Sequence, residues 1–116
     1  MLASKYRFHG YGSLKFLFSH GKTYRSKSLS VRVTLNTRRQ NSRVAVVISK
    51  KVIKASPKRN RVRRRVYEVL RTEWQHIKPA HDILISVYDP AFFDADHSVI
   101  AAEIKRVLIT AQVWVD

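Results

Sequence analysis

The sequence of 116 residues contains no cysteine and only three glycines and three prolines. Without cysteine, disulfides and thiolate metal sites are excluded, which fits a reducing compartment. No apolar run approaches the roughly 18 residues that a membrane-spanning helix requires, and the first residues lack the apolar stretch of a secretory signal. We therefore expect a cytoplasmic protein without membrane contact. The length favours a single domain, residues 1–116.

Acidic residues are absent from the first part of the chain. Residues 1–67 hold 19 of the 23 lysines and arginines, and all 8 acidic residues follow, beginning with Glu68. The net charge of +15 makes a folded domain repel itself unless a polyanion neutralises it. Nucleic acid is the partner that this imbalance favours. An anionic membrane surface and a merely solvated basic face are the alternatives.

Hydrophobic periodicity predicts the elements of the first half. Ser13 is an acceptable N-cap for a short helix that stops at Gly21. A brief strand at 23–25 precedes an alternating strand at 28–35, whose pattern predicts one buried and one polar face. Residues 43–49 are apolar on both faces, which is typical of a central strand.

The second half predicts two helices around one strand. Ser56, followed by proline, is the expected N-cap of a long helix over residues 57–77. A strand follows at 82–88, and Asp94 or Asp96 can cap a last helix. Each helix has an apolar stripe that we expect to face the core, and these stripes are Val62, Val66, Val69, Leu70, Trp74 and Ile77 in the long helix and Ile100, Ile104, Val107, Leu108 and Ala111 in the last one. This order predicts an α/β (α+β) two-layer sandwich with a mixed sheet, in which the long helix crosses between two strands.

Basic residues are densest at the start of the long helix. Nine lie between residues 50 and 65. Asn60, Arg64, Tyr67 and Arg71 fall at i, i+4, i+7 and i+11, which predicts one ridge beside the core-facing stripe. Guanidinium forks, an amide and an aromatic ring suit phosphate oxygens and base edges. A solvated basic face is the alternative, but it would place glutamates at i+4 from its lysines.

The sequence shows no catalytic constellation. The five histidines lack the spacing of metal ligands, and Asp94, Asp96 and His97 resemble a helix cap more than a metal site. There is no glycine-rich phosphate loop, nucleophile elbow or pair of carboxylates. We therefore predict no catalytic residue and no metal ligand in the protein.

Two short motifs carry a resemblance to a known family. Residues 49–52 read Ser-Lys-Lys-Val and residues 59–61 read Arg-Asn-Arg, which resembles the signature of the bacterial ribonuclease P protein subunit. The resemblance extends to residues 14–21 and 82–85 and covers nearly the whole chain. It implies an αβββαβα fold with a left-handed crossover, against the usual right-handed preference.

The resemblance also implies a function and its partners. In this family the RNA subunit cleaves precursor tRNA with Mg²⁺, and the protein holds the single-stranded 5′ leader in a cleft between the first helix and the sheet. The expected partners are the catalytic RNA subunit and precursor tRNA, with no obligate protein partner. The protein is then an enzyme component only within the ribonucleoprotein, and Mg²⁺ is bound mainly by the RNA.

Two sets of site residues follow from the motif and the resemblance. The RNA-binding set is Lys50, Lys51, Lys58, Arg59, Asn60, Arg61, Arg63, Arg64 and Tyr67. The leader cleft is Leu14, Phe18, Ser30 and Arg32. Phe18 matches a cleft aromatic, whereas Leu14 and Arg32 stand where the family has aromatic residues and Tyr67 where it has a basic one. From the residues alone, Phe18 is a core contact or a stacking surface, and Ser30 and Arg32 line a groove or face solvent.

Other classes of protein remain as alternatives. A ribosomal or ribosome-assembly protein fits the size and charge, but gives no reason for the two motifs. A nuclease acting alone would need a carboxylate cluster, which the basic half of the chain lacks.

Overall fold

The computed structural model describes residues 4–7, 17, 19–38 and 40–116. The helix predicted to start at Ser13 therefore lies mostly outside the described residues, as do Leu14 and Phe18. Of that helix, Leu17, Ser19 and His20 are described and helical.

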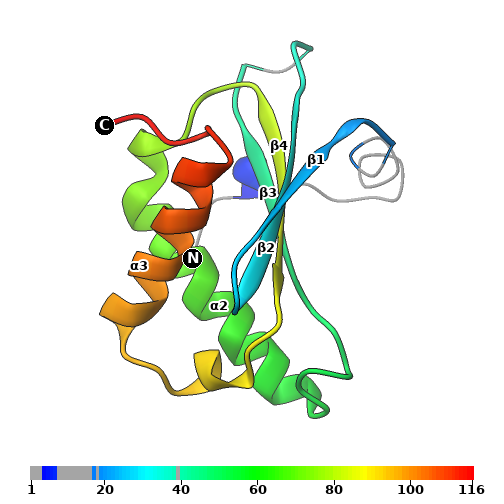
Figure 1. The fold of residues 1–116 in the computed structure, drawn as a ribbon, viewed down its shortest axis with the longest axis vertical. Helices are drawn as coiled ribbons and strands as arrows, with labels where there is room; N and C mark the ends of the chain where they lie inside the picture. The colour runs from blue at the N-terminus through cyan, green and yellow to red at the C-terminus, as the bar shows by residue number, and fades with distance from the viewer. Residues whose placement is uncertain (1–3, 8–16, 18, 39) are drawn as a thin grey trace.

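Four strands form one mixed sheet in the order β1-β2-β4-β3 (Figure 1). β2 (Leu29–Leu35) pairs antiparallel with β1 (Lys22–Arg25) on one side and with β4 (His81–Val87) on the other. β3 (Arg43–Ile48) runs parallel to β4, and the long helix connects the two. The predicted mixed sheet with a crossover helix is thus confirmed.

β3 is an edge strand, so the prediction of a central strand at 43–49 was wrong. Its apolar run arises because both of its faces are partly covered rather than because strands flank it. Val46 points into the core, whereas Val47 is 42% exposed. On the second face Ala45 packs against Leu17 and Leu84, which form a small apolar cluster there.

Two helices cover one face of the sheet (Figure 1). α2 spans Ser56–Glu73 and continues into the 3-10 turn η2 (Trp74–His76), so its α-helical part ends earlier than predicted. Ala55, not Ser56, is its N-cap, and no side chain caps it. α3 spans His97–Thr110 with Asp96 as its N-cap, and the 3-10 turn η3 (Pro90–Phe93) precedes it.

The core lies between the helices and the sheet. The predicted stripes are buried, with Val66 and Leu70 of α2 and Ile104 of α3 packed on Val31 and the other inward residues of the sheet. Each fully buried aliphatic side chain contributes about 1.5–3 kcal/mol relative to exposure. Leu35, expected on the buried face of β2, is instead 56% exposed because it ends the strand beyond the core.

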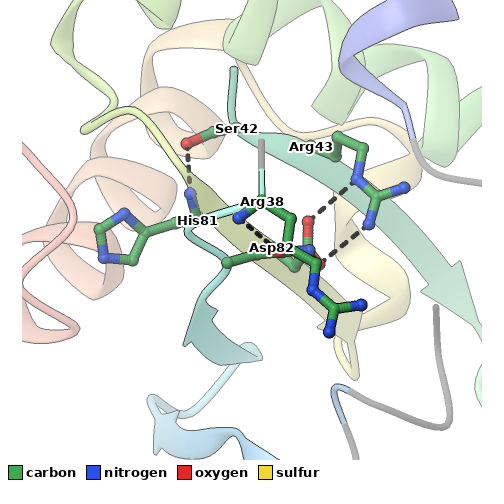
Figure 2. Close-up of polar contacts among 6 residues, drawn as sticks. Arg38, Ser42, Arg43, His81 and Asp82 are labelled. Carbon is green, nitrogen blue, oxygen red and sulfur yellow. Dashed lines mark hydrogen bonds and ion pairs between the residues drawn. The ribbon is translucent and has the colours of Figure 1, made fainter. Parts of the chain in front are cut away.

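A buried ion pair joins β3 to β4 on the second face of the sheet (Figure 2). Arg43 donates to both carboxylate oxygens of Asp82, at 3.0 and 2.9 Å. Asn36 donates a further bond of 3.0 Å to the same carboxylate. The hydroxyl of Ser42 accepts from the backbone N–H of His81 at 2.9 Å. These bonds attach the 36–42 loop to the start of β4 and set the register of the parallel pair.

Tyr67 lies in the core, so its predicted place on an exposed ridge was wrong. Its side chain is 6% exposed, and its hydroxyl accepts a 3.3 Å hydrogen bond from the backbone N–H of Val46. On the helical wheel it lies only about 60° from Leu70, so its ring reaches the edge of β3. Burial raises the pKa of Tyr67, although the bond from Val46 and the cations of Arg7 and Arg63 oppose this.

Tyr67→Phe should lower the free energy of unfolding by about 1–3 kcal/mol, because it leaves the Val46 N–H without its partner. Folding raises the phenol pKa above 10.0, so the stability tied to the neutral phenol is present below pH 10 and is lost as pH rises further. The variant should therefore lose less stability than the wild type between about pH 9 and 11. Denaturant titrations of both proteins across this pH range test the prediction. Unfolding free energies that fall in parallel with pH in the wild type and the variant would contradict it.

Candidate nucleic-acid interface

The basic segment lies at the end of the sheet where β3 leads into α2 (Figure 1). Lys50, Lys51 and Lys54 are exposed in the preceding loop, and Lys58 is exposed in the first turn of the helix. The first N–H groups of an α-helix carry a partial positive charge, which adds to that of the side chains. This end of the molecule is therefore a site for anions.

Arg59 and Arg61 are attached to neighbouring backbone carbonyls. Arg59 donates from Nη1 to the carbonyls of Ile53 and Lys54, at 3.0 and 2.8 Å, and so closes the loop before the helix. Arg61 donates from Nε to the Phe93 carbonyl at 3.0 Å. A carbonyl bears only a partial negative charge, so each guanidinium is held in place while keeping its net charge.

Arg63 and Arg65 are also bonded to backbone carbonyls. Arg65 donates from Nη1 to the carbonyls of Phe92 and Phe93 at 2.9 and 3.1 Å, and from Nη2 to that of Ala95. Arg63 donates from Nε to the Val46 carbonyl at 3.3 Å. Together with Tyr67, Arg63 therefore satisfies both outward-facing backbone groups of Val46 at the edge of β3.

Arg64 differs from its four neighbours. It is exposed and makes no hydrogen bond or ion pair with any residue in the described part of the chain. Beside it, Asn60 accepts a 2.7 Å bond from Arg63 at Oδ1, which leaves the amide N–H groups as donors for a ligand. Pro57, Asn60, Arg63 and Arg64 line an open hollow of about 410 Å³. Arg64 and Asn60 are therefore the best placed of the predicted residues to reach RNA.

A second hollow of about 340 Å³ lies on the other side of the helix start, between Lys54, Lys58 and the turn at Pro90. Its aromatic wall is Phe93, which the sequence analysis did not single out. The Lys58 ammonium lies 5.5 Å and the Arg61 guanidinium 5.1 Å from the centre of that ring. Such cation–π contacts hold both cations near the helix start. The only sequence signal was an aromatic residue shortly after an Asp-Pro pair.

The leader-cleft residues that are described share the second face of the sheet. Arg32 donates from Nε to the Leu17 carbonyl at 3.1 Å and from Nη1 to the Thr23 hydroxyl at 2.8 Å. Gly21 also donates to the Leu17 carbonyl, at 2.8 Å, and a Cβ there would lie 2.6 Å from that oxygen. Arg32 is thus neither plain solvent surface nor wholly available to a ligand, because it fastens the end of the first helix to the sheet.

Ser30 lies on the same face but is only 5% exposed. Its hydroxyl is 2.8 Å from the hydroxyl of Tyr88, a residue that the sequence analysis placed only at a strand end. Alternation from Ser86 could have put Tyr88 on this face. The structure therefore adds an aromatic ring to the surface on which Ser30 and Arg32 lie.

No group of three or more histidine, cysteine, aspartate or glutamate residues in the described part of the chain could hold a metal ion. Likewise, none of the described helices is long and apolar enough to cross a membrane.

The fold and the anchored arginines define a class, the small α+β proteins that bind a polyanion such as RNA at a basic helix end. A protein-family model described as ribonuclease P matches residues 2–112. The chain belongs to the ribonuclease P protein family.

Relatives agree with this assignment. The chain is 30% identical over 114 residues to the ribonuclease P protein component of a Picosynechococcus strain, covering 97% of this chain and 96% of the relative. It is 39% identical over 88 residues to that of Clostridioides difficile, covering 72% and 75%. None of these relatives supports the ribosomal alternative.

Solved structures share the fold. The ribonuclease P protein of Staphylococcus aureus superposes with a TM-score of 0.82 at 22% identity, covering 94% of this chain and 97% of that one. The protein of Thermotoga maritima gives 0.77 at 23% identity, covering 88% and 94%.

Substitutions of two adjacent arginines on α2 should separate their contribution to RNA binding from their contribution to the stability of the fold. Arg64→Ala should leave the melting temperature unchanged and lower the log–log slope of RNA affinity against salt by about one, because one phosphate contact is lost. Arg65→Ala should instead destabilise the fold by at least about 1.5 kcal/mol, because its bonds to three carbonyls disappear. Filter binding at several salt concentrations and thermal melts test both variants. An unchanged slope for Arg64→Ala would show that this ridge faces away from RNA.

Proposed function

We propose that this chain is the protein partner of a catalytic RNA, and that together they cleave precursor tRNA to form the mature 5′ end. In this proposal the RNA carries the chemistry with its own Mg²⁺, and the protein supplies binding and positioning. Family membership and the anion site at the start of α2 support this division, as does the lack of a carboxylate cluster among the described residues. A cytoplasmic location accords with a chain that contains no cysteine.

The observation that carries the proposal is the set of arginines held by carbonyl bonds at the start of α2. Most surface arginines must lose side-chain entropy when they bind phosphate. Here Arg59, Arg61, Arg63 and Arg65 are already ordered by the fold, while their net charge is not neutralised. We infer that this cluster, with Lys50, Lys51, Lys58, Asn60 and Arg64, contacts the phosphate backbone of the catalytic RNA.

The second part of the proposal concerns the 5′ leader. We place the single-stranded leader on the sheet face that carries Ser30 and Arg32, beside the end of the first helix. Leu14 and Phe18 belong to the same proposed cleft by their resemblance to the family, although they lie outside the described residues. Arg32 is partly committed to Leu17 and Thr23, so its main role there is to shape the cleft.

The protein alone should show no nuclease activity, whereas adding it to a bacterial ribonuclease P RNA with Mg²⁺ should raise cleavage of precursor tRNA at low salt. The reason is that the basic residues offset the repulsion between two RNAs, which salt otherwise screens. Single-turnover cleavage of a labelled precursor measures the effect. Metal-dependent, site-specific cleavage by rigorously RNA-free protein would contradict the proposal.

A further inference from the structure

The sheet face opposite the helices is organised in rows of side chains across the strands. Thr23, Arg32, Leu84 and Ala45 form one row by their strand register. This row is the one that Leu17 and the Arg32 guanidinium cover. The next row lies about 7 Å away, two residues further along each strand.

This neighbouring row is polar at its centre, and exposed residues stand at both ends. Ser30 pairs with Ser86 at the centre, Arg25 stands at one end and Val47 at the other. Arg25 is exposed, and Val47 is 42% exposed. This strip of the sheet face therefore offers an exposed cation at one end and an exposed apolar side chain at the other, while Ser30 between them is buried.

Tyr88 lies against this row with its ring accessible. Its backbone N–H donates to the Ser28 carbonyl at 2.7 Å, which continues the pairing of β4 with β2 by one residue. Its hydroxyl is 2.8 Å from that of Ser30, while 43% of the residue remains exposed. Tyr88 is thus held by one hydrogen bond at its backbone and another at its hydroxyl. A ligand that stacks on the ring therefore loses little affinity to ordering the side chain.

We propose that Tyr88 is a stacking platform for one unpaired base of single-stranded RNA, with Arg25 in the same strip receiving a phosphate. This inference rests on the proposed function and names a further residue that binds the single-stranded leader within it. A tyrosine face accepts any base, and a neighbouring arginine neutralises the backbone charge. A membrane or an acidic protein would not need a flat ring beside the cation.

A stacking role for Tyr88 changes which residue of the proposed leader cleft supplies an aromatic surface. In the sequence, Arg32 stands where the family has an aromatic residue of the cleft. The structure brings an aromatic ring to the adjoining row from the end of β4 instead. A stacking surface is therefore retained, one row away from Arg32. Arg32 itself attaches the end of the first helix to the sheet.

The test uses the protein assembled with a bacterial ribonuclease P RNA. Affinity is measured for precursor tRNA with a leader and for the same tRNA without one. Tyr88→Ala should weaken precursor binding about tenfold and leave leaderless tRNA unchanged. Tyr88→Phe should bind nearly as the wild type does, since it keeps the ring. Tyr88→Leu, which keeps apolar bulk without a flat face, should behave like Tyr88→Ala. Ile109→Ala, at a site of similar exposure (50%) on α3 across the sheet, is the matched control.

Precursors with a single abasic nucleotide identify the stacked base. At one leader position the abasic change should weaken wild-type binding about tenfold and have no further effect on Tyr88→Ala. Equal losses for both tRNAs, additive losses at every leader position, or normal binding by Tyr88→Ala would overturn the inference. Failure of the proposed function would appear differently, as a wild-type assembly that does not distinguish precursor from leaderless tRNA.

Discussion

The hydrogen bonds from arginine side chains to backbone carbonyls are the interaction on which the rest of this structure depends. Five arginines between residues 59 and 65 would repel one another on an isolated helix. Four of them are held apart by carbonyls of the preceding loop, of β3, and of the segment from η3 to Ala95. These cations therefore stabilise the fold, because their bonds attach the preceding loop, β3 and the segment from η3 to Ala95 to the start of α2.

The same bonds explain how the sheet ends without a further strand at its β3 edge. An edge strand exposes backbone donors and acceptors that can pair with another chain. Val46 directs both its N–H and its carbonyl away from β4, and side chains of α2 satisfy both. At Val44 the same edge is covered by a parallel bridge from Arg7, so α2 and the N-terminal segment share the protection of this strand. The opposite sheet face carries polar and partly exposed side chains such as Arg32 and Tyr88.

The expected structure was wrong at positions where one sequence pattern fits two different structural environments. Residues 43–49 are apolar on both faces, and this pattern does not distinguish a strand between two others from an edge strand with a covered second face. Tyr67 follows the spacing of Asn60 and Arg64, but a ring is long enough to reach sideways to β3 from the border of the core stripe. For Ser30 the alternation left a groove and plain solvent open, and the structure shows a buried side chain that contacts Tyr88. Each error arose because side-chain reach and cover depend on neighbours distant in the sequence.

By itself the sequence determined the α+β class, the core stripes of both helices, and the density of cations at the start of α2, because periodicity and charge are local properties. Only the tertiary structure decided the strand order, which of the five arginines at residues 59–65 are anchored to the described residues, and which aromatic ring lies on the sheet face opposite the helices. The partners involved, Arg65 with Phe92 or Ser30 with Tyr88, are separated by tens of residues. Their contacts follow from the packing of η3 against α2 and from the pairing of β4 with β2, which no local pattern encodes.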